Sequence, residues 1–413
     1  MRGSMTVKEA KEVVVLAGRK LVESGLIART WGNVSCRISE SHFVITPSGR
    51  DYLSLTPEEI VEVAIADLSY QSNIKPSSEK GVHAEVYKLH PEINFVIHTH
   101  QEHASCAGVL GMDSIPVSAE YTLLKGELIC AQYGLPGTKK LRKGVADALT
   151  QAKGKAILMK NHGALCFGAD YEETFRVAME LEHACGQFIL DQYHKIGDNT
   201  INDPIRIGCF ALSKLTEKAI TVEDKATLLP FESERNSEGF CLKIGDAAYD
   251  FKSNGQDDFA TLKSDDPAGA DPVLLKEARL HSQIYKDHTD IQAIVHADTP
   301  GIIAVSCAEI KLLPLLDDFA QIAGTSVKAS STDAKKVSAS LSSASAVFIK
   351  NYGALCCGGS KGDAFASAIV TEKNSNALIS AALFGKVHYI KHLEAALMRF
   401  VYLKKYSKQM NKK

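Results

Sequence analysis

The sequence predicts an α/β protein built from two tandem domains. The chain has 413 residues, which is more than one ordinary hydrophobic core requires. Segments with apolar residues at helical spacing alternate with short apolar runs of the kind that form buried strands. The second half of the chain also repeats patterns of the first half. We therefore expect a short leader over 1–4, a first domain over 5–205 and a second domain over 206–413.

Local patterns predict the elements of the first half. Apolar side chains recur at helical spacing over 6–24, and Gly25 follows them as a helix stop. Thr56 and Pro57 are a typical N-cap and first residue of a short helix. We further expect strands over 30–38, 42–46, 94–98, 156–159 and 164–168, and helices over 79–90, 101–110 and 171–193.

Composition excludes several classes of partner. The chain carries 47 Lys and Arg against 49 Asp and Glu, and this net charge of -2 predicts no nucleic-acid partner and no anionic membrane surface. No apolar run approaches the ~18–20 residues that a membrane span needs. The 10 cysteines lie without Cys-x-x-Cys pairs, which indicates reduced thiols in a cytoplasmic protein. The first four residues, ahead of Met5, are typical of a vector-derived leader.

Three histidines form the most informative pattern. His98 and His100 end an apolar run, and side chains two apart on a strand point to the same face. His162 follows another apolar strand. Three imidazoles with an open fourth position are typical of a catalytic metal site. The alternative is that His98 and His100 are polar residues on a solvated strand face.

Residues near the histidines could bind an anion and move a proton. Asn33, Ser48 and Gly49 lie in two turns that could present N–H groups and hydroxyls to an anion, although each is also compatible with an ordinary turn. Glu79 stands at a predicted helix start. A carboxylate near a metal can move a proton, but at this place it could also simply complement the helix dipole.

The internal repeat predicts a second copy that has lost the metal ligands. Residues 280–298 align with 82–100 at an offset of 198 (296 − 98), and 347–356 align with 157–166 at an offset of 190 (352 − 162). An offset of 206 aligns 243–255 with 37–49 and places Gly239 opposite Asn33. Ligands and hydroxyls change at the aligned positions: His100 to Asp298, His162 to Tyr352, Ser77 to Leu275, Ser78 to Lys276 and Tyr121 to Phe319. His296 and Glu277 still match His98 and Glu79.

Five motifs in order carry a resemblance to a known family. They are Gly32-Asn33-Val34-Ser35, Thr46-Pro47-Ser48-Gly49, Pro76-Ser77-Ser78-Glu79, His98-Thr99-His100 and Asn161-His162-Gly163. Over roughly residues 6–195 the chain resembles the class II aldolase/adducin family. The resemblance implies a three-layer α/β/α domain around a mostly antiparallel sheet, here twice in tandem. It also implies a cyclic tetramer with active sites between subunits, which two tandem chains would supply as a homo-oligomer.

The resemblance assigns a role to each candidate residue. His98, His100 and His162 would hold Zn²⁺, with Mn²⁺ or Fe²⁺ as alternatives because imidazole binds all three. Glu79 and Tyr121 would be catalytic. The phosphate of a sugar phosphate would be bound by Asn33, Ser48, Gly49, Ser77 and Ser78.

The implied reaction is cleavage or formation of a C–C bond in a ketose phosphate. A divalent metal would stabilise the enediolate left by retro-aldol cleavage, with a dihydroxyacetone-phosphate-type donor. Epimerases, dehydratases and decarboxylases of the same family are alternatives, although epimerases typically carry Asp where Glu79 stands. A non-catalytic, adducin-like scaffold is a further alternative, but such scaffolds lack the metal histidines.

Overall fold

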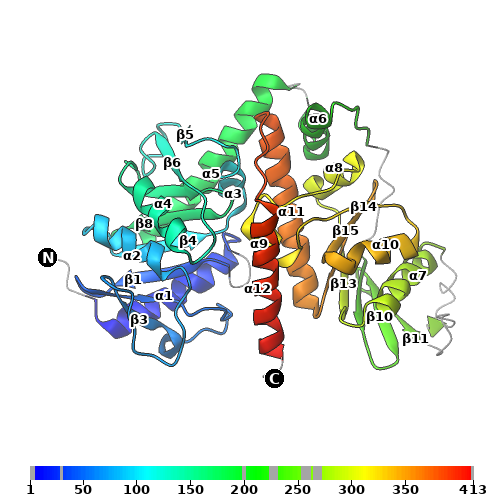
Figure 1. Ribbon diagram of the computed structural model, residues 1–413, viewed down its shortest axis with the longest axis horizontal. Coiled ribbons are helices and arrows are strands. Elements are labelled where there is room, and N and C mark those ends of the chain that lie inside the picture. The colour runs from blue at the N-terminus through cyan, green and yellow to red at the C-terminus, as the bar shows by residue number, and fades with distance from the viewer. Residues whose placement is uncertain are drawn as a thin grey trace. The chain divides into compact units, whose positions relative to one another are not determined.

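The computed structural model describes residues 5–27, 31–197, 201–222, 231–252, 262–263 and 272–410 (Figure 1). The predicted leader over 1–4 lies outside these residues. Contacts divide the chain into two units, Met1–Lys195 with Lys386–His388, and Ile196–Gly385 with Tyr389–Lys413. They are called the first and the second unit below. Each contains one sheet with helices packed on it.

The first unit is built on an 8-stranded sheet in the order β3-β2-β1-β4-β8-β7-β6-β5. Neighbouring strands are antiparallel except β6 and β7, which are parallel. The sequence prediction of a mostly antiparallel sheet is thus confirmed. The strands are β1 (Asn33–Arg37), β2 (His42–Ile45), β3 (Val61–Ala64), β4 (Phe95–Thr99), β5 (Ser114–Pro116), β6 (Glu127–Ala131), β7 (Ala156–Met159) and β8 (Gly163–Gly168).

Helices cover both faces of this sheet. Val96 of β4 packs in one apolar cluster with residues of α2 and α4. The ring of the preceding Phe95 contacts that of Tyr171 in α5, so α5 lies on the opposite face. The unit therefore has the three predicted layers. Its helices are α1 (Val7–Glu23), the 3-10 turn η1 (Pro57–Glu59), α2 (Lys80–Leu89), α3 (Glu102–Ala107), α4 (Lys139–Leu149) and α5 (Tyr171–Ile196).

The second unit repeats this plan with an 8-stranded sheet in the order β12-β11-β10-β9-β13-β16-β15-β14. Only β14 and β15 among its described pairs are parallel. Its strands are β9 (Phe231–Arg235), β10 (Gly239–Ile244), β11 (Ala247–Lys252), β12 (Leu262–Lys263), β13 (Ala293–Ala297), β14 (Ala329–Ser330), β15 (Ala346–Ile349) and β16 (Gly353–Gly358). Its helices are α6 (Pro204–Thr216), α7 (Pro272–Asp287), α8 (Pro300–Ala308), α9 (Asp317–Ile322), α10 (Ala334–Ser340), the 3-10 turn η3 (Leu341–Ser343), α11 (Lys361–Leu383) and α12 (His392–Met410).

Strand register corrects one alignment between the two copies. Ser233 of β9 pairs with Ile294 of β13, just as Ser35 of β1 pairs with Val96 of β4. Both members are shifted by 198, so Phe231 is the counterpart of Asn33 and the predicted match with Gly239 was wrong. The error arose because Gly239 begins β10, the second strand of a hairpin. Alternating patterns do not distinguish one strand of a hairpin from the other.

The helix that carries the Glu79 counterpart also begins earlier in the second copy. An offset of 198 would start α7 at residue 278, but it starts at Pro272, which is 6 residues sooner. Pro76 and Ser77 favour a turn in the first copy, whereas Leu275 and Lys276 are good helix formers. A turn with two serines has thus become a helical turn.

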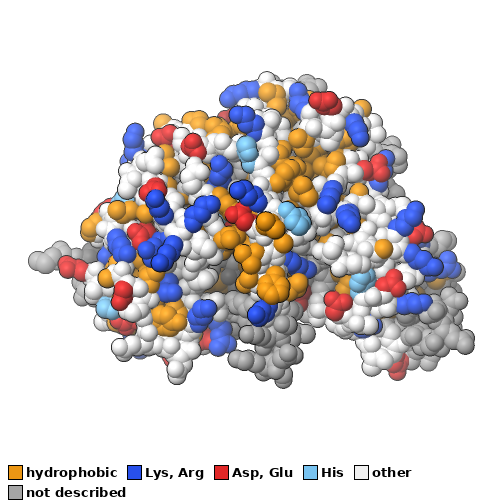
Figure 2. All heavy atoms as spheres, in the orientation of Figure 1, with side chains coloured by type: hydrophobic (Ala, Val, Ile, Leu, Met, Phe, Trp, Pro, Cys, Tyr) orange, Lys and Arg blue, Asp and Glu red, His pale blue; other side chains and the backbone are white. Residues whose placement is uncertain are grey.

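The visible face of the molecule carries side chains of both charges. In Figure 2 basic and acidic side chains both occur over it. Within the described residues, no helix combines the length and the apolar composition that would let it cross a bilayer. All 10 cysteines are free thiols, and all but Cys241 are buried.

Candidate metal centre

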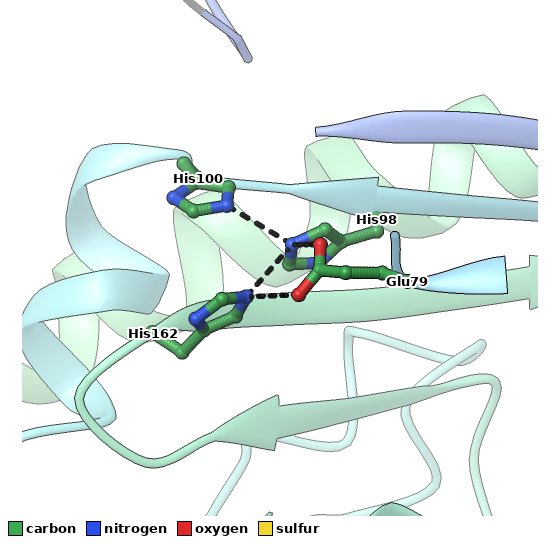
Figure 3. Close-up of side chains that lie close together, drawn as sticks. All are labelled: Glu79, His98, His100 and His162. Carbon is green, nitrogen blue, oxygen red and sulfur yellow. Dashed lines mark hydrogen bonds and ion pairs between the residues drawn. The ribbon is translucent and has the colours of Figure 1, made fainter. Parts of the chain in front are cut away.

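Three histidines and one glutamate meet at one end of the first unit's sheet (Figure 3). His98 lies on β4, and His100 follows directly after this strand. His162 lies in the turn between β7 and β8, and Glu79 precedes the first residue of α2. The structure thus brings together residues from three separate parts of the chain, and the three predicted metal ligands are all among them.

The nitrogens of the three rings converge on one point. His98 Nε2 lies 3.0 Å from His100 Nε2 and 3.1 Å from His162 Nε2. The carboxylate of Glu79 faces the same point, with Oε2 at 3.2 Å from His98 Nε2 and Oε1 at 3.0 Å from His162 Nε2. His98, His162 and Glu79 are all buried, so these polar groups face one another rather than solvent.

A backbone contact fixes the orientation of His98. Its Nδ1 lies 2.8 Å from the carbonyl oxygen of Ala164 on the neighbouring strand. A carbonyl oxygen can only accept, so Nδ1 carries the proton and Nε2 offers its lone pair to the cluster. Burial opposes ionisation of Glu79, but the adjacent His162 and His98 hold its pKa well below the usual range.

The donor set fits a divalent cation. All four ligand atoms lie within 4.8 Å of one another, and within the described part of the chain this is the only such group of His, Cys, Asp or Glu. Zinc–nitrogen bonds of about 2.0–2.1 Å place two tetrahedral ligands about 3.3 Å apart, close to the separations seen here. Imidazole and carboxylate are also ligands for Mn²⁺ and Fe²⁺, so the residues do not select one metal.

The turn that carries His162 depends on its neighbours. Asn161 adopts a left-handed φ of 59°, which Asn tolerates better than most residues. A Cβ on Gly163 would lie 2.3 Å from the carbonyl oxygen of Thr99. Only glycine lets β8 approach β4 this closely, and this approach sets His162 beside His98.

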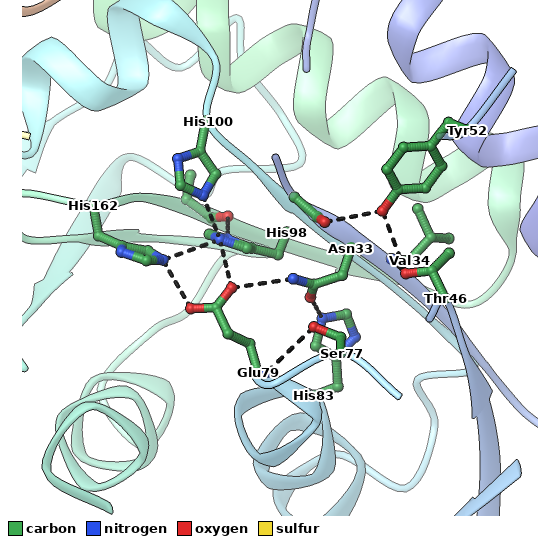
Figure 4. A network of polar contacts seen from close by, with 12 residues as sticks. Asn33, Val34, Thr46, Tyr52, Ser77, Glu79, His83, His98, His100 and His162 are labelled. Atoms are coloured by element: carbon green, nitrogen blue, oxygen red, sulfur yellow. Dashed lines mark hydrogen bonds and ion pairs between the residues drawn. The ribbon is translucent and has the colours of Figure 1, made fainter. Parts of the chain in front are cut away.

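A chain of buried hydrogen bonds holds the Glu79 carboxylate on the side away from the three converging histidines (Figure 4). Asn33 Nδ2 donates to Glu79 Oε2 over 3.1 Å, and Asn33 Oδ1 bonds His83 Nε2. His83 Nδ1 in turn lies 2.6 Å from Ser35 Oγ, which contacts the Tyr87 hydroxyl at 2.7 Å. Burial lowers the pKa of His83 to about 3, so this ring is neutral and can donate to Asn33.

The role of this network was missed from sequence, although a signal for it exists. Ser233, His281 and Tyr285 form the same contacts in the second unit, at 2.7 Å and 2.8 Å from the Ser233 hydroxyl. The same three residue types recur at the single offset of 198. Their joint recurrence in both copies is the signal of a shared structural role.

The residues predicted to bind phosphate fall into two groups. Backbone bonds from Ser48 N to Lys75 O (2.9 Å) and from Ser77 N to Thr46 O (3.0 Å) bring two turns side by side. These turns hold Ser48, Gly49, Ser77 and Ser78, of which Gly49 and Ser78 are exposed. The side chain of Asn33 is instead buried against Glu79, as described above.

Tyr121 stands apart from the cluster. Its ring is half-buried, and its pKa is raised by partial burial and by the nearby carboxylates of Glu120, Asp191 and Glu180. Of the contacts made by the described residues, none joins Tyr121 to the histidines or to Glu79. Its predicted catalytic role stays a prediction.

The second unit has rearranged the equivalent centre. His296, the counterpart of His98, directs Nε2 to the carbonyl oxygen of Tyr352 at 2.5 Å. This nitrogen must therefore carry a proton, so it is not available as a metal ligand. Asp298 and Tyr352 occupy the places of His100 and His162 in the aligned sequences.

A family model for the class II aldolase and adducin N-terminal domain matches residues 12–189 and again 233–379. The chain belongs to this family. It contains two copies of the class II aldolase domain, and the metal donor set of the first is absent from the described residues of the second.

Characterised relatives of this aldolase family cover the length of one domain. A 5-deoxy-D-ribulose 1-phosphate aldolase of Bacillus thuringiensis is 32% identical over 195 residues, which are 47% of this chain and 90% of the relative. An L-fuculose phosphate aldolase of Haemophilus influenzae is 32% identical over 181 residues (43% and 81%). A 3-oxo-tetronate 4-phosphate decarboxylase of the same organism is 30% identical over 202 residues (46% and 92%).

Proposed function

We propose that the first unit is a divalent-metal-dependent aldolase that cleaves or forms a C–C bond in a ketose phosphate. One observation carries the proposal, which is the convergence of His98, His100, His162 and Glu79 on a single point. The names of two relatives, a 5-deoxy-D-ribulose 1-phosphate aldolase and an L-fuculose phosphate aldolase, support a ketose 1-phosphate as substrate. The donor product would then be dihydroxyacetone phosphate.

Each residue of the cluster has a distinct task in this proposal. His98, His100 and His162 would hold a cation, Zn²⁺ or else Mn²⁺ or Fe²⁺, which as a Lewis acid favours the negative charge that builds up on substrate oxygens during retro-aldol cleavage. Glu79 is ionised and lies against the same point, so its carboxylate accepts and returns the substrate proton. Asn33 and neutral His83 hold Glu79 in place.

The paired turns supply the anchor for the substrate phosphate. Ser77 and Ser78 directly precede Glu79 at the start of α2. Backbone hydrogen bonds hold the turn of Ser48 and Gly49 beside them. Phosphate bound at this place would set the sugar chain against Glu79, and binding energy at the phosphate would thereby orient the reacting carbon. Tyr121 is proposed as a second proton donor that acts at the metal centre of a neighbouring chain in the assembly.

A decarboxylase acting on a 3-oxo sugar acid phosphate is the second candidate. It is supported by the 30% identity to the 3-oxo-tetronate 4-phosphate decarboxylase. Both reactions break a C–C bond next to a carbonyl and leave the same kind of enediolate charge, so the same donors would serve either. The substrate that the protein cleaves therefore decides between them.

One pair of measurements tests the proposal. Elemental analysis should find about one divalent metal per chain, and His98→Ala should lose it. The metal-loaded protein should release dihydroxyacetone phosphate from a ketose 1-phosphate and should release no CO₂ from a 3-oxo acid phosphate. The reverse substrate preference would favour the decarboxylase, and a protein without metal after reconstitution would contradict both.

We further propose that two chains assemble into a ring of four domains in the cytoplasm. The tandem family domains and the ten free cysteines support this reading. Light scattering should give the mass of a dimer, whereas a fully active monomer would rule the ring out.

A further inference from the structure

The second unit contains a cavity of about 330 Å³, and we propose that it binds a small hydroxylated organic anion without a metal ion. The walls of the cavity come from α7, from the start of α10 and from the turn between β15 and β16. All of its lining residues belong to the second unit. The proposal is independent of the reaction carried out by the first unit.

The cavity lies at the second unit's counterpart of the metal centre. Glu277 corresponds to Glu79 at the offset of 198, and Tyr352 corresponds to His162 at the offset of 190. Both residues line the cavity. The place where the first unit gathers its metal donors has thus remained open space in the second unit, although the donors themselves have changed.

The chemistry of the cavity excludes the first unit's mode of binding. His296 uses Nε2 to donate to the carbonyl oxygen of Tyr352. Lys276 stands at the position of Ser78, which introduces a positive charge where the first unit has a hydroxyl. The exposed Lys276 adds a positive charge at the mouth of the cavity, which favours an anion there.

Two polar groups face each other at the inner end of the cavity and have no other hydrogen-bond partner in the described part of the chain. They are Oε2 of Glu277, a residue only 2% exposed, and the hydroxyl of Tyr352. Burial raises the pKa of both groups. The facing Tyr352 hydroxyl and Lys276 partly offset this for Glu277, whereas the Glu277 carboxylate raises the pKa of Tyr352 further. A buried carboxyl and a phenol that satisfy only each other keep donor and acceptor capacity to spare, which suits a ligand with hydroxyl groups.

Two cations stand at the outer end. Lys276 and Arg279 line the cavity, and both side chains are exposed. Neither makes a hydrogen bond or an ion pair with any residue that the structure describes. An arginine fork and a neighbouring ammonium suit a phosphate or a carboxylate group. Leu280 and Ile349 add apolar side chains to the lining of the cavity.

The size of the cavity limits the ligand. A volume of about 330 Å³ lies at the small end of the range for small-molecule sites. The ligand that matches both ends is therefore a short carbon chain with hydroxyl groups at one end and one phosphate or carboxylate at the other. Sugar phosphates and sugar acids share this chemistry.

Calorimetric titration of the chelator-treated full-length protein tests the proposal with four probes. Glycerol 3-phosphate and glycerate carry hydroxyls and an anion, inorganic phosphate carries the anion alone, and glycerol carries the hydroxyls alone. We expect glycerol 3-phosphate or glycerate to bind more tightly than phosphate or glycerol, and the tighter of the two identifies the anionic group. Hydrogen exchange of peptides from α7 and from the β15–β16 turn should slow when this probe is added, which locates binding in the second unit.

Three variants separate the two ends of the cavity. Lys276→Ala with Arg279→Ala should weaken the anionic probe by about tenfold or more, because two charge-assisted contacts are lost. Tyr352→Phe removes one hydroxyl and keeps the ring, so it should fold, weaken the hydroxylated probe and leave inorganic phosphate unchanged. The exposed Lys335→Ala on α10, which does not line the cavity, is the matched control and should change neither.

Three outcomes would overturn the proposal. The first is that no probe slows exchange in α7. The second is binding that survives the loss of Lys276 and Arg279 unchanged, which would place the anion elsewhere. The third is equal binding of inorganic phosphate and glycerol 3-phosphate, since the inner end would then make no contribution.

Discussion

His98 donates its Nδ1 proton to the carbonyl oxygen of Ala164 across 2.8 Å, and this contact decides which nitrogen faces the metal centre. The counterpart His296 donates from Nε2 to the carbonyl of Tyr352 instead. Both rings lie on equivalent strands of equivalent sheets. On the same fold, the two rings therefore differ in which nitrogen remains available to a metal.

Gly163→Ala is expected to remove the metal without unfolding the protein. The new Cβ would lie 2.3 Å from the Thr99 carbonyl oxygen, so the β7–β8 turn must move and carry His162 away from His98. We expect metal affinity to fall by about 10–100-fold or more, measured by competition with a chromophoric chelator.

The control is Gly353→Ala in the second unit, where a φ of 104° adds backbone strain for alanine. Its Cβ would also meet a carbonyl oxygen at 2.3 Å, that of Ala297, but no metal donor set lies beside it among the described residues. This variant should lower thermal stability and leave metal content unchanged. Equal metal loss in both variants would show that the effect of Gly163→Ala is general destabilisation.

Asn33→Ala distinguishes two roles for this side chain. If Asn33 positions Glu79, as its 3.1 Å bond to Oε2 indicates, kcat should fall by about 10–100-fold while KM changes little. If it binds substrate phosphate, as the sequence resemblance implies, KM should rise instead. Steady-state kinetics on the metal-loaded variant separate the two, and metal content serves as the control for an intact centre.

The three candidate metal ligands could be predicted from sequence because each signal is local. His98 and His100 share a strand face by simple alternation, and His162 follows a recognisable apolar strand. Their convergence with Glu79 then requires only that neighbouring strands and one helix end meet at the same edge of a sheet. The mostly antiparallel sheet and the duplication were anticipated through the family resemblance and the repeated motifs.

The supporting network was beyond the reach of such patterns. Ser35, His83 and Tyr87 come from a strand and a helix whose relative register no local pattern fixes. The short strands β3, β5 and β6 were not anticipated, nor was α4, because brief apolar segments between turns carry little periodicity. The alignment error at Gly239 arose because the two strands of a hairpin carry similar alternating patterns in sequence.

Glu182→Gln is expected to loosen α3, the helix that follows His100. The Glu182 carboxylate accepts from the backbone N–H groups of His103 (2.8 Å) and Ala104 (3.1 Å), which begin this helix. Loss of its charge should cost about 1–2 kcal/mol of unfolding free energy at neutral pH. Hydrogen exchange of the Ala104 amide should accelerate, whereas amides of α4 should not change.

The pH dependence of this effect has a definite sign. Burial opposes ionisation of Glu182, but His103 and the two N–H groups lower its pKa below 4.5. Its contribution is therefore present above pH 4.5 and is lost as pH falls through the lower pKa of the folded state. Denaturant titrations should show wild type and Glu182→Gln becoming equally stable in acid, and a constant difference down to about pH 3 would contradict this.

Asp318→Ala should destabilise the second unit severely. Asp318 of α9 and Lys373 of α11 form an ion pair in which the two residues are only 3% and 6% exposed. Removing the carboxylate takes the Asp318 charge away from a buried ammonium, which typically costs about 3–5 kcal/mol. The exposed pair of Lys350 with Glu309, at 2.7 Å, is the control, and Glu309→Ala should cost less than about 1 kcal/mol. Replacing Asp318 by Leu and Lys373 by Met together should restore much of the stability, because neither member of the pair is then left buried without the other. Chemical unfolding of the four proteins measures this, and similar losses for Asp318→Ala and Glu309→Ala would show that burial of the pair has no energetic consequence.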